Sequence, residues 1–355
     1  MSKSLRHLFM VIGLAVMCLV IAACGQSGSQ PAKSDSSGVV KLKIADTYPP
    51  TAVNYKVMKE IFIPALERSG KIKVEYYPGG EIAKAEDMLE LVQDGTVDIA
   101  YVSPGFVAGA LPLSSVISLP MEFGSDNKVA SDIVWELVKR DPLKGEFEKR
   151  GVKPVYLSMN PCSEIFMKDK PVALPKDIKG MTIRGGGGDA NETLVLMGAS
   201  VVGIATNDLY ESLQKGTISG MSYNFGSLLP YSLEEVTKFA TDGADLGSLV
   251  AIYLMNLKRW NSLPPDIQEI IRQAGDLAVK EQAARYAAEV EAGKAGFQKK
   301  GGVIHKLTDQ EKQEWKSAVS VAKDQWIKKM EGRGFKQAKQ AYDELQAVKK
   351  QLGAK

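Results

Sequence analysis

The chain has 355 residues, with 45 lysine and arginine residues against 42 aspartate and glutamate residues and a formal net charge of +3. Hydrophobic residues make up 45% and charged residues 25%, which excludes a disordered, collagenous or multi-span membrane chain. The charge surplus is small and no dense basic block occurs, so no nucleic-acid partner is expected. The length exceeds the roughly 250–300 residues that one core supports, which predicts two domains.

The first residues have the pattern of an export signal rather than of a fold. Two basic residues precede an apolar run over 8–23 that is shorter than a membrane span. The sequence Ile-Ala-Ala-Cys at 21–24 is similar to the lipobox of bacterial lipoproteins. This resemblance implies that residues 1–23 are removed as a signal peptide and that Cys24 is lipidated. An ordinary signal peptide or a single anchor helix is the alternative. Residues 24–38 are expected to form a flexible tether.

The cysteines predict a fold without an internal disulfide. Cys18 lies in the expected signal and Cys24 at its end, so Cys162 stands alone in the folded part. Cys162 could be a nucleophile that a histidine activates. After removal of the expected signal, however, His305 is the one histidine left, and it lies far away in the sequence. A structural cysteine is the simpler interpretation. The same scarcity argues against a metal site, and we expect no cofactor.

The folded part alternates short apolar strands with helical patterns. Taken in chain order, strands are predicted over 39–44, 72–77, 97–102, 152–159, 165–167, 181–183 and 249–257, and helices over 54–68, 88–93, 190–197 and 209–213. A longer helix is predicted to follow, with Ser262 as its N-cap, Pro264 and Pro265 in its first turn and its end near Lys300. This alternation is typical of an α/β sheet with right-handed crossovers.

A short internal repeat suggests two lobes of related build. Gln-Asp-Gly-Thr-Val at 93–97 recurs as Gln-Lys-Gly-Thr-Ile at 214–218. Each copy follows a helical stretch and precedes an apolar strand. Gly95 and Gly216 are therefore expected to supply left-handed C-caps.

The long helix is expected to lie across both lobes. At ~1.5 Å per residue its thirty-odd residues reach roughly 50 Å, which is more than the width of one lobe. Two lobes tied by several connections would hinge around a cleft. The predicted boundaries are 39–162 with 249–285 for the first lobe, 163–248 with 286–330 for the second, and a C-terminal helix over 331–355.

A run of glycines follows the strand at 181–183. Within Gly-Gly-Gly-Gly-Asp-Ala at 185–190, Gly185, Gly187 and Ala190 satisfy the Gly-x-Gly-x-x-Ala pattern of dinucleotide sites. An exported enzyme that uses a nucleotide cofactor is therefore an alternative. Asp189 at the helix start would repel a pyrophosphate, and such a pattern usually opens a domain. The glycines would more readily let backbone N–H groups approach a smaller anion.

Arg184 is the main candidate for ligand binding. It ends the strand at 181–183, beside the glycine turn and a predicted helix N-terminus. A guanidinium group offers two parallel N–H donors that match the two oxygens of a carboxylate. Nearby backbone amides would complete a carboxylate clamp. A surface arginine at a strand end is the other interpretation.

Three segments carry a resemblance to a known family: Leu-Pro-Lys-Asp-Ile-Lys-Gly-Met-Thr-Ile-Arg at 174–184, Gly-Ala at 198–199 and Asp-Leu-Tyr-Glu-Ser-Leu-Gln-Lys-Gly at 208–216. Residues 78–98 add a pattern of turn, helix, glycine and aspartate. Together these segments make residues 42–326 similar to substrate-binding proteins of tripartite ATP-independent periplasmic (TRAP) transporters, of the C4-dicarboxylate-binding type. The resemblance implies an α/β, two-lobed periplasmic-binding-protein fold with a hinge, a long helix across both lobes and a ligand cleft. It also implies small and large integral-membrane partner subunits and a salt bridge from Arg184 to the ligand carboxylate.

The resemblance implies further ligand-binding candidates, for each of which a packing or turn role is the alternative. In the second lobe they follow strands or the arginine, and in the first lobe they lie at strand ends or at the rim: Tyr223, Asn224, Gly187, Thr206, Ser103, Tyr48 and Lys84.

Glu164 is a further ligand-binding candidate. It is also a departure from the sialic-acid-binding members of that family, which place a second arginine there. An acidic residue would repel a second carboxylate unless it is paired, for which Arg184 and Lys168 are the candidates. A ligand with one carboxylate and a hydroxyl, carbonyl or amine group is therefore favoured over a dianion.

The predicted function is a lipid-anchored, extracytoplasmic solute-binding protein that is not an enzyme. It would capture an organic acid in the periplasm or at the outer face of the cytoplasmic membrane and deliver it to membrane subunits. A binding protein that serves a sensor or an ATP-driven importer remains an alternative, as does the exported nucleotide-cofactor enzyme.

Overall fold

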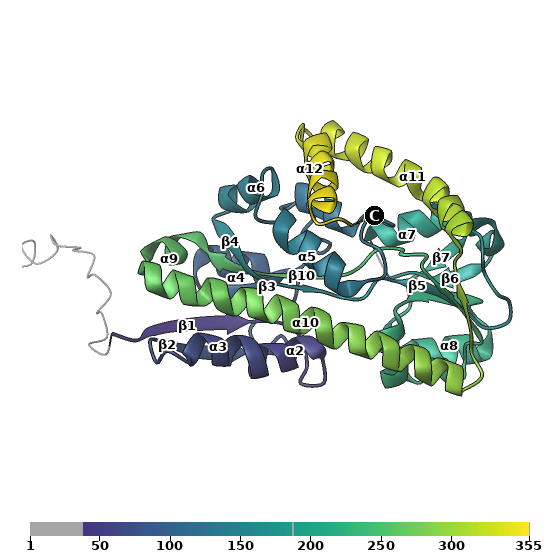
Figure 1. The fold of residues 1–355 in the computed structure, drawn as a ribbon, viewed down its shortest axis with the longest axis horizontal. Helices are drawn as coiled ribbons and strands as arrows, with labels where there is room; N and C mark the ends of the chain where they lie inside the picture. Colours follow the sequence, from purple (N-terminus) through teal and green to yellow (C-terminus); the bar gives the residue numbers. More distant parts are fainter. Residues whose placement is uncertain (1–37, 187, 355) are drawn as a thin grey trace, which may run out of the picture. The chain divides into compact units, whose positions relative to one another are not determined.

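The computed structural model describes residues 38–186 and 188–354, and the chain from Val40 onwards forms one compact unit. The strands of these residues form two sheets, with the orders β2-β1-β3-β10-β4 and β11-β9-β5-β8-β6-β7 (Figure 1). Each sheet with its helices forms one lobe, so the predicted α/β architecture with two lobes is confirmed. The expected signal peptide, Cys24 and Gly187 lie outside the described residues.

The first lobe is built on a mixed sheet. Its strands are β1 (Val40–Ala45), β2 (Ile72–Tyr77), β3 (Ile99–Val102), β4 (Val152–Met159) and β10 (Val250–Asn256). Strand β1 pairs in parallel with β2 and β3, whereas β10 runs antiparallel to β3 and β4. All seven residues of β10 are buried, as expected for a central strand covered on both faces.

Helices cover this first sheet. They are α2 (Val53–Val57), α3 (Ile63–Glu67), α4 (Met88–Asp94), α5 (Asn127–Leu137), α6 (Leu143–Lys149) and α9 (Leu257–Ser262). A π-helical turn over Met58–Phe62 joins α2 to α3, so the single helix predicted over 54–68 is continuous but contains a wider turn.

The second lobe is built on a sheet with a hydrophobic cluster on each face. Its strands are β5 (Glu164–Met167), β6 (Thr182–Arg184), β7 (Ser200–Val202), β8 (Gly220–Tyr223), β9 (Phe239–Asp242) and β11 (Val303–Lys306). Ile165 and Ile183 belong to one cluster with Leu194 of α7 (Gly188–Leu196). Phe166 belongs to the other, with Leu213 of α8 (Leu209–Lys215). Successive strand residues face opposite sides, which explains the alternation.

The two copies of the internal repeat occupy equivalent places in the two lobes. Helix α4 ends at Gly95 with φ 83°, and helix α8 ends at Gly216 with φ 72°. Both glycines have the left-handed conformation, and each helix is followed by a strand, β3 or β8. The predicted helix–glycine–strand repeat is confirmed.

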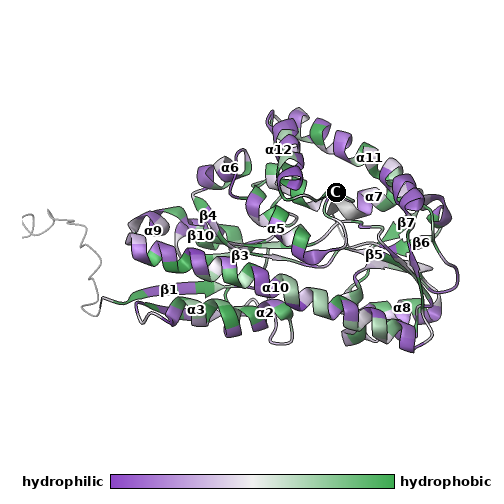
Figure 2. Ribbon diagram, in the orientation of Figure 1, coloured by the Kyte–Doolittle hydropathy of each residue, from purple (hydrophilic) through white to green (hydrophobic). Residues whose placement is uncertain are grey.

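Helix α10 (Pro265–Lys299) has 35 residues and contacts both lobes. Figure 1 shows it running along both sheets, and Figure 2 shows hydrophilic and hydrophobic residues alternating along its length. Two glycines permit the close approach: a methyl group at Gly275 would collide with the carbonyl of Val155, and one at Gly293 with the carbonyl of Phe225. The prediction of a long helix across both lobes is confirmed.

The predicted cap of this helix is wrong. Ser262 ends α9, where its hydroxyl donates to the Arg259 carbonyl at 2.7 Å, and Pro264 is the residue that precedes α10. The reason is a separate cap upstream, because the Asn256 side chain accepts from the Arg259 N–H at 3.0 Å and starts the short helix α9.

A second helix, α11 (Asp309–Gly332), also contacts both lobes. The Trp315 indole donates to the carbonyl of Ala173 in the second lobe at 2.8 Å. The Trp326 indole donates to the Ser115 hydroxyl in the first lobe at 2.7 Å. Helix α12 (Ala338–Gln351) then packs against α5. Among the helices of residues 38–186 and 188–354, none combines the length and apolar character needed to cross a membrane.

Candidate functional site

Arg184 is the last residue of β6, between β7 and β8 in the second sheet. Its Nε donates to the Ile204 carbonyl at 3.2 Å, and its Nη1 lies 3.4 Å from the Ser222 carbonyl. Both contacts are to backbone oxygens of neighbouring segments, which fix the direction of the guanidinium group. The side chain is therefore held in place without losing its net charge.

The charge of Arg184 is only partly solvated. The residue is half-buried, and burial lowers the pKa of its guanidinium group. The Tyr223 ring lies 5.5 Å from the guanidinium carbon, an attractive cation–π contact. Among the side chains that the structure describes, no carboxylate pairs with Arg184. A half-buried cation is costly to desolvate, and an anion that binds there would relieve this cost.

The structure brings Tyr223 close to Arg184 in the second lobe, and Thr206 close to Tyr223. Tyr223 ends β8, and Thr206 begins a short turn two residues after Ile204. Asn224 follows Tyr223, but its Oδ1 accepts from the Ser227 N–H at 3.0 Å and starts the next turn. The side-chain oxygen of Asn224 therefore has a structural role. The prediction for Gly187 falls outside the described residues.

Two of the three first-lobe candidates lie at the ends of adjacent parallel strands. Tyr48 follows β1 and Ser103 follows β3, so both are at the same edge of the first sheet. Tyr48 packs edge-on against Tyr101 with ring centroids 5.2 Å apart. Its buried hydroxyl finds no hydrogen-bond partner among the described residues. Ser103 is buried, and Lys84 is exposed on the loop between β2 and α4.

Asp46 is a residue at this edge that the sequence did not single out. It is fully buried, and its Oδ2 accepts from the hydroxyls of Tyr76 at 2.7 Å and Tyr253 at 2.9 Å. Its Oδ1 accepts from the Tyr48 N–H at 3.0 Å. Burial raises the pKa of Asp46, and these donors oppose that shift. Asp46 thus holds the backbone of Tyr48; its only sequence signal was a carboxylate directly after an apolar strand.

Glu164 pairs with neither of the two candidate cations, Arg184 and Lys168, among the described residues. The Oε2 of Glu164 accepts from the backbone N–H groups of Gly243 at 3.0 Å and Ala244 at 2.7 Å. The Lys168 ammonium donates to a backbone carbonyl at 2.9 Å instead. Glu164 is only 2% exposed, and burial raises its pKa to about 8. The carboxyl group is therefore directed at the backbone rather than at a neighbouring cation.

Cys162 has the properties of a structural thiol. It is a free cysteine, and its Sγ lies 3.4 Å from the Oε1 of Glu164. Burial and the nearby carboxylates raise the thiol pKa well above its usual value, which suppresses the thiolate that a nucleophile needs. His305 lies on β11 and contacts Glu311 at 2.9 Å. Within the described residues no cluster of three or more potential metal-ligating side chains occurs.

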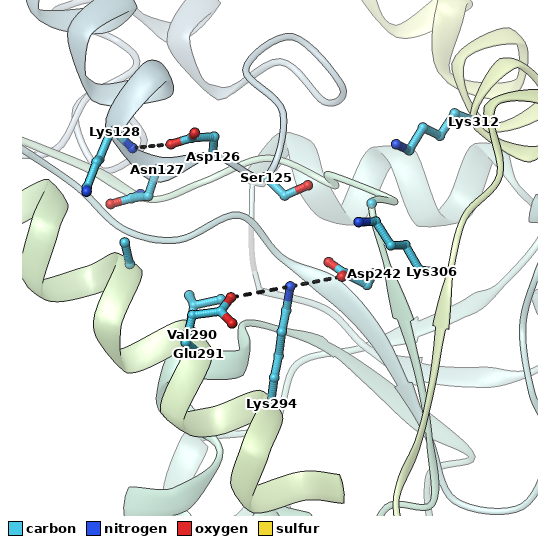
Figure 3. A pocket seen from close by; sticks show the side chains of 12 residues that line it. Ser125, Asp126, Asn127, Lys128, Asp242, Val290, Glu291, Lys294, Lys306 and Lys312 are labelled. Carbon is cyan, nitrogen blue, oxygen red and sulfur yellow. Dashed lines mark hydrogen bonds and ion pairs between the residues drawn. The ribbon is translucent and has the colours of Figure 1, made fainter.

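A hollow of about 380 Å³ lies elsewhere, between the start of α5, the ends of β9 and β11, and α10 (Figure 3). None of the predicted ligand-binding residues lines it. Its charged side chains are four lysines and three carboxylates, and Lys294 pairs with Asp242 at 2.9 Å. Asp126 accepts from the first backbone N–H groups of α5. The hollow therefore carries charges of both signs, several of which serve the local structure.

Two α/β lobes, joined by chain crossovers and by a helix that lies along both, define the class of two-lobed binding proteins. Residues 45–329 match the family model of DctP, described as bacterial extracellular solute-binding protein, family 7. The chain belongs to this family. The resemblance to the TRAP-type solute-binding proteins is thereby confirmed, and the family supports a binding protein rather than an enzyme.

Individual relatives agree with this assignment. The C4-dicarboxylate-binding periplasmic protein DctP of Vibrio cholerae is 25% identical, over 74% of this chain and 77% of that protein. A TRAP periplasmic solute-binding protein from Desulfovibrio salexigens, solved in an open form, is 26% identical with a TM-score of 0.78, covering 87% of this chain and 95% of that one. A TRAP solute-binding protein from Rhodoferax ferrireducens with copurified benzoate is 25% identical with a TM-score of 0.72, covering 89% and 99%.

Proposed function

We propose that this protein is the extracytoplasmic component of a TRAP transporter and captures an organic acid through a salt bridge between Arg184 and the ligand carboxylate. The observation that carries the proposal is the half-buried guanidinium group of Arg184. Two backbone carbonyls hold it, and no described carboxylate neutralises it. Such a group is already oriented for an anion, so little further ordering is needed on binding.

The contacts of Arg184 suggest how the acid is held. With Nε and one Nη1 hydrogen directed at carbonyls, the edge formed by Nη1 and Nη2 can offer two parallel donors to a carboxylate. Tyr223 packs against the guanidinium group from one side. Closure of the lobes over the ligand would exclude water and strengthen the ion pair as the local dielectric falls. Tyr48 and Ser103 would then form the opposing wall of the cleft.

The ligand class follows from the relatives and from Arg184 together. The Rhodoferax ferrireducens protein holds benzoate, and the Vibrio cholerae relative is named for C4-dicarboxylates. Both are carboxylic acids, which is the chemistry that a guanidinium fork recognises. Because Glu164 binds backbone amides, the sequence-based argument against a dianion loses its basis.

We further propose that residues 1–23 are a signal peptide, that Cys24 carries the lipid anchor and that residues 24–38 tether the anchor to the two lobes. The lobe boundaries that we propose are the ones predicted from the sequence. Small and large integral-membrane subunits would receive the ligand. Membership of an extracellular solute-binding family supports export. Incorporation of labelled palmitate into the wild type but not into Cys24→Ser is the expected result; equal labelling would contradict the anchor.

The proposal is tested by a thermal-shift screen of carboxylates with the wild type and Arg184→Lys. A ligand that binds only the folded protein stabilises it by about 2.7 kcal/mol at a hundredfold excess over its Kd. Lysine keeps the charge but cannot supply two parallel donors. We expect an acid that stabilises the wild type to lose most of this effect in the variant. Undiminished stabilisation of Arg184→Lys would contradict capture by the guanidinium fork.

A further inference from the structure

Two short segments without regular secondary structure carry the chain between the sheets and lie side by side. Residues 160–163 lead from β4 to β5, and residues 243–249 lead from β9 to β10. Three backbone hydrogen bonds join them: Asn160 N–H to Leu249 O at 2.9 Å, Ser163 N–H to Gly247 O at 2.9 Å and Leu246 N–H to Ser163 O at 2.8 Å. These hydrogen bonds join the two crossovers into one paired connection between the sheets.

Glu164 adds the side-chain contact that fixes this pair at the second lobe. It is the first residue of β5, where the first crossover ends. One of its carboxyl oxygens accepts from two successive N–H groups, those of Gly243 and Ala244, where the second crossover begins. A buried acceptor that satisfies two backbone donors is expensive to remove, because both donors would be left without a partner.

The second crossover is tied to the first lobe by its next residue. Asp245 has a positive φ of 41°, and its Oδ2 accepts from the Gly124 N–H at 2.7 Å. Its carbonyl accepts from the Met121 N–H, also at 2.7 Å. Glu164 and Asp245 therefore anchor the same short segment to opposite lobes.

The register of β5 connects Glu164 to the ligand site. In the antiparallel pair of β5 and β8, Glu164 lies directly opposite Tyr223. Tyr223 in turn lies 5.5 Å from the guanidinium group of Arg184. A displacement of the start of β5 would thus displace the strand that lies beside Arg184.

We propose that Glu164 is a positioning residue: its carboxyl group holds the two crossovers at a fixed register and so determines the geometry in which Arg184 meets an acid between the lobes. It acts through the backbone of Gly243 and Ala244 and does not touch the ligand. The part of this inference that concerns affinity rests on the proposed function. The part that concerns the crossovers does not.

The first experiment measures amide hydrogen exchange by NMR in the ligand-free wild type, Glu164→Met and Glu164→Gln. Methionine has a similar length but no acceptor oxygen, whereas glutamine keeps one. We expect exchange at Gly243 and Ala244 to be about tenfold to a hundredfold faster in Glu164→Met and nearly unchanged in Glu164→Gln. Ile252, in the buried strand β10, reports any global loss of stability. Glu211→Met, at an exposed helical position, is the matched control. If Glu164→Met raised the exchange rates of Gly243 and Ala244 by no larger a factor than that of Ile252, the proposal would be overturned.

The second experiment measures calorimetric affinities for benzoate and succinate as probes of one and two carboxylates. A positioning role predicts that Glu164→Gln leaves the ratio of the two affinities unchanged and that Glu164→Met weakens both by the same factor. A selective gain for succinate in Glu164→Gln would show direct contact with the ligand and overturn the proposal. If the wild type bound these and other carboxylates no better than Arg184→Lys, the proposed function would fail, and the exchange comparison would still decide the role of Glu164.

Discussion

Helix α10 lies on both lobes at positions where only a hydrogen atom fits, and this gives a sharp prediction. At Gly293 a methyl group would penetrate the carbonyl of Phe225, in the turn that follows Tyr223 and Asn224. The obstacle is backbone, so no side-chain rotation can relieve it. The helix or the turn must therefore move by on the order of 1 Å to restore a normal contact distance.

The magnitude of the Gly293→Ala effect is the difference of two terms. Overpacking of this kind costs about 1–3 kcal/mol, and alanine in a helix interior gains about 0.5–1 kcal/mol over glycine. We therefore expect Gly293→Ala to lower the free energy of unfolding by roughly 0–2.5 kcal/mol, with a central value of about 1 kcal/mol. Gly275→Ala, which meets the Val155 carbonyl in the first lobe, should behave similarly.

Denaturant unfolding followed by circular dichroism measures this effect, with Gly332→Ala as the matched control. Gly332 ends α11, and a methyl group there would meet nothing within 4 Å. The control should be neutral or stabilised by up to about 1 kcal/mol, because only the helix propensity changes. A midpoint of Gly293→Ala equal to or above that of Gly332→Ala would refute the claim that α10 touches the second lobe through its glycines.

Two further predictions concern buried carboxyl groups. Burial raises the pKa of Glu164 from 4.5 to about 8, with Asp242 and Asp245 as further contributors, so the protonated form is favoured in the folded state. As the pH rises from about 4.5 to about 8, the free energy of unfolding of the wild type should fall relative to that of Glu164→Gln, by at most about 1.4 kcal/mol per pH unit. Parallel pH profiles of the two proteins would contradict this prediction. Asp46→Ala should lower the free energy of unfolding by more than about 2 kcal/mol, since the hydroxyls of Tyr76 and Tyr253 lose their acceptor. A calorimetric loss below about 0.5 kcal/mol would mean that water replaces the carboxylate.

The sequence by itself determined several of the local elements and the glycines that end two of the helices. Apolar runs such as 72–77 and 152–159 predicted β2 and β4 with the bounds that the structure has, and the glycines at 95 and 216 predicted the helix ends. Tyr223 and Ser103 were named through the family resemblance, and their contact with a ligand stays a prediction. Arg184 was singled out because it ends a strand beside a glycine turn and a predicted helix start, and its role stays a prediction too. Such signals depend on neighbours a few residues away, so they are visible along the chain.

Only the tertiary structure decided which distant groups meet. The sequence offered Arg184 and Lys168 as candidate partners of Glu164, but its partners are backbone N–H groups 79 and 80 residues away, in the returning crossover. Asp46 was overlooked because its partners, among them Tyr253, come from strands far along the chain. Hydrogen bonds of buried carboxyl groups depend on which strands become neighbours in a sheet, and that order is set by the packing of the whole lobe rather than by any local pattern.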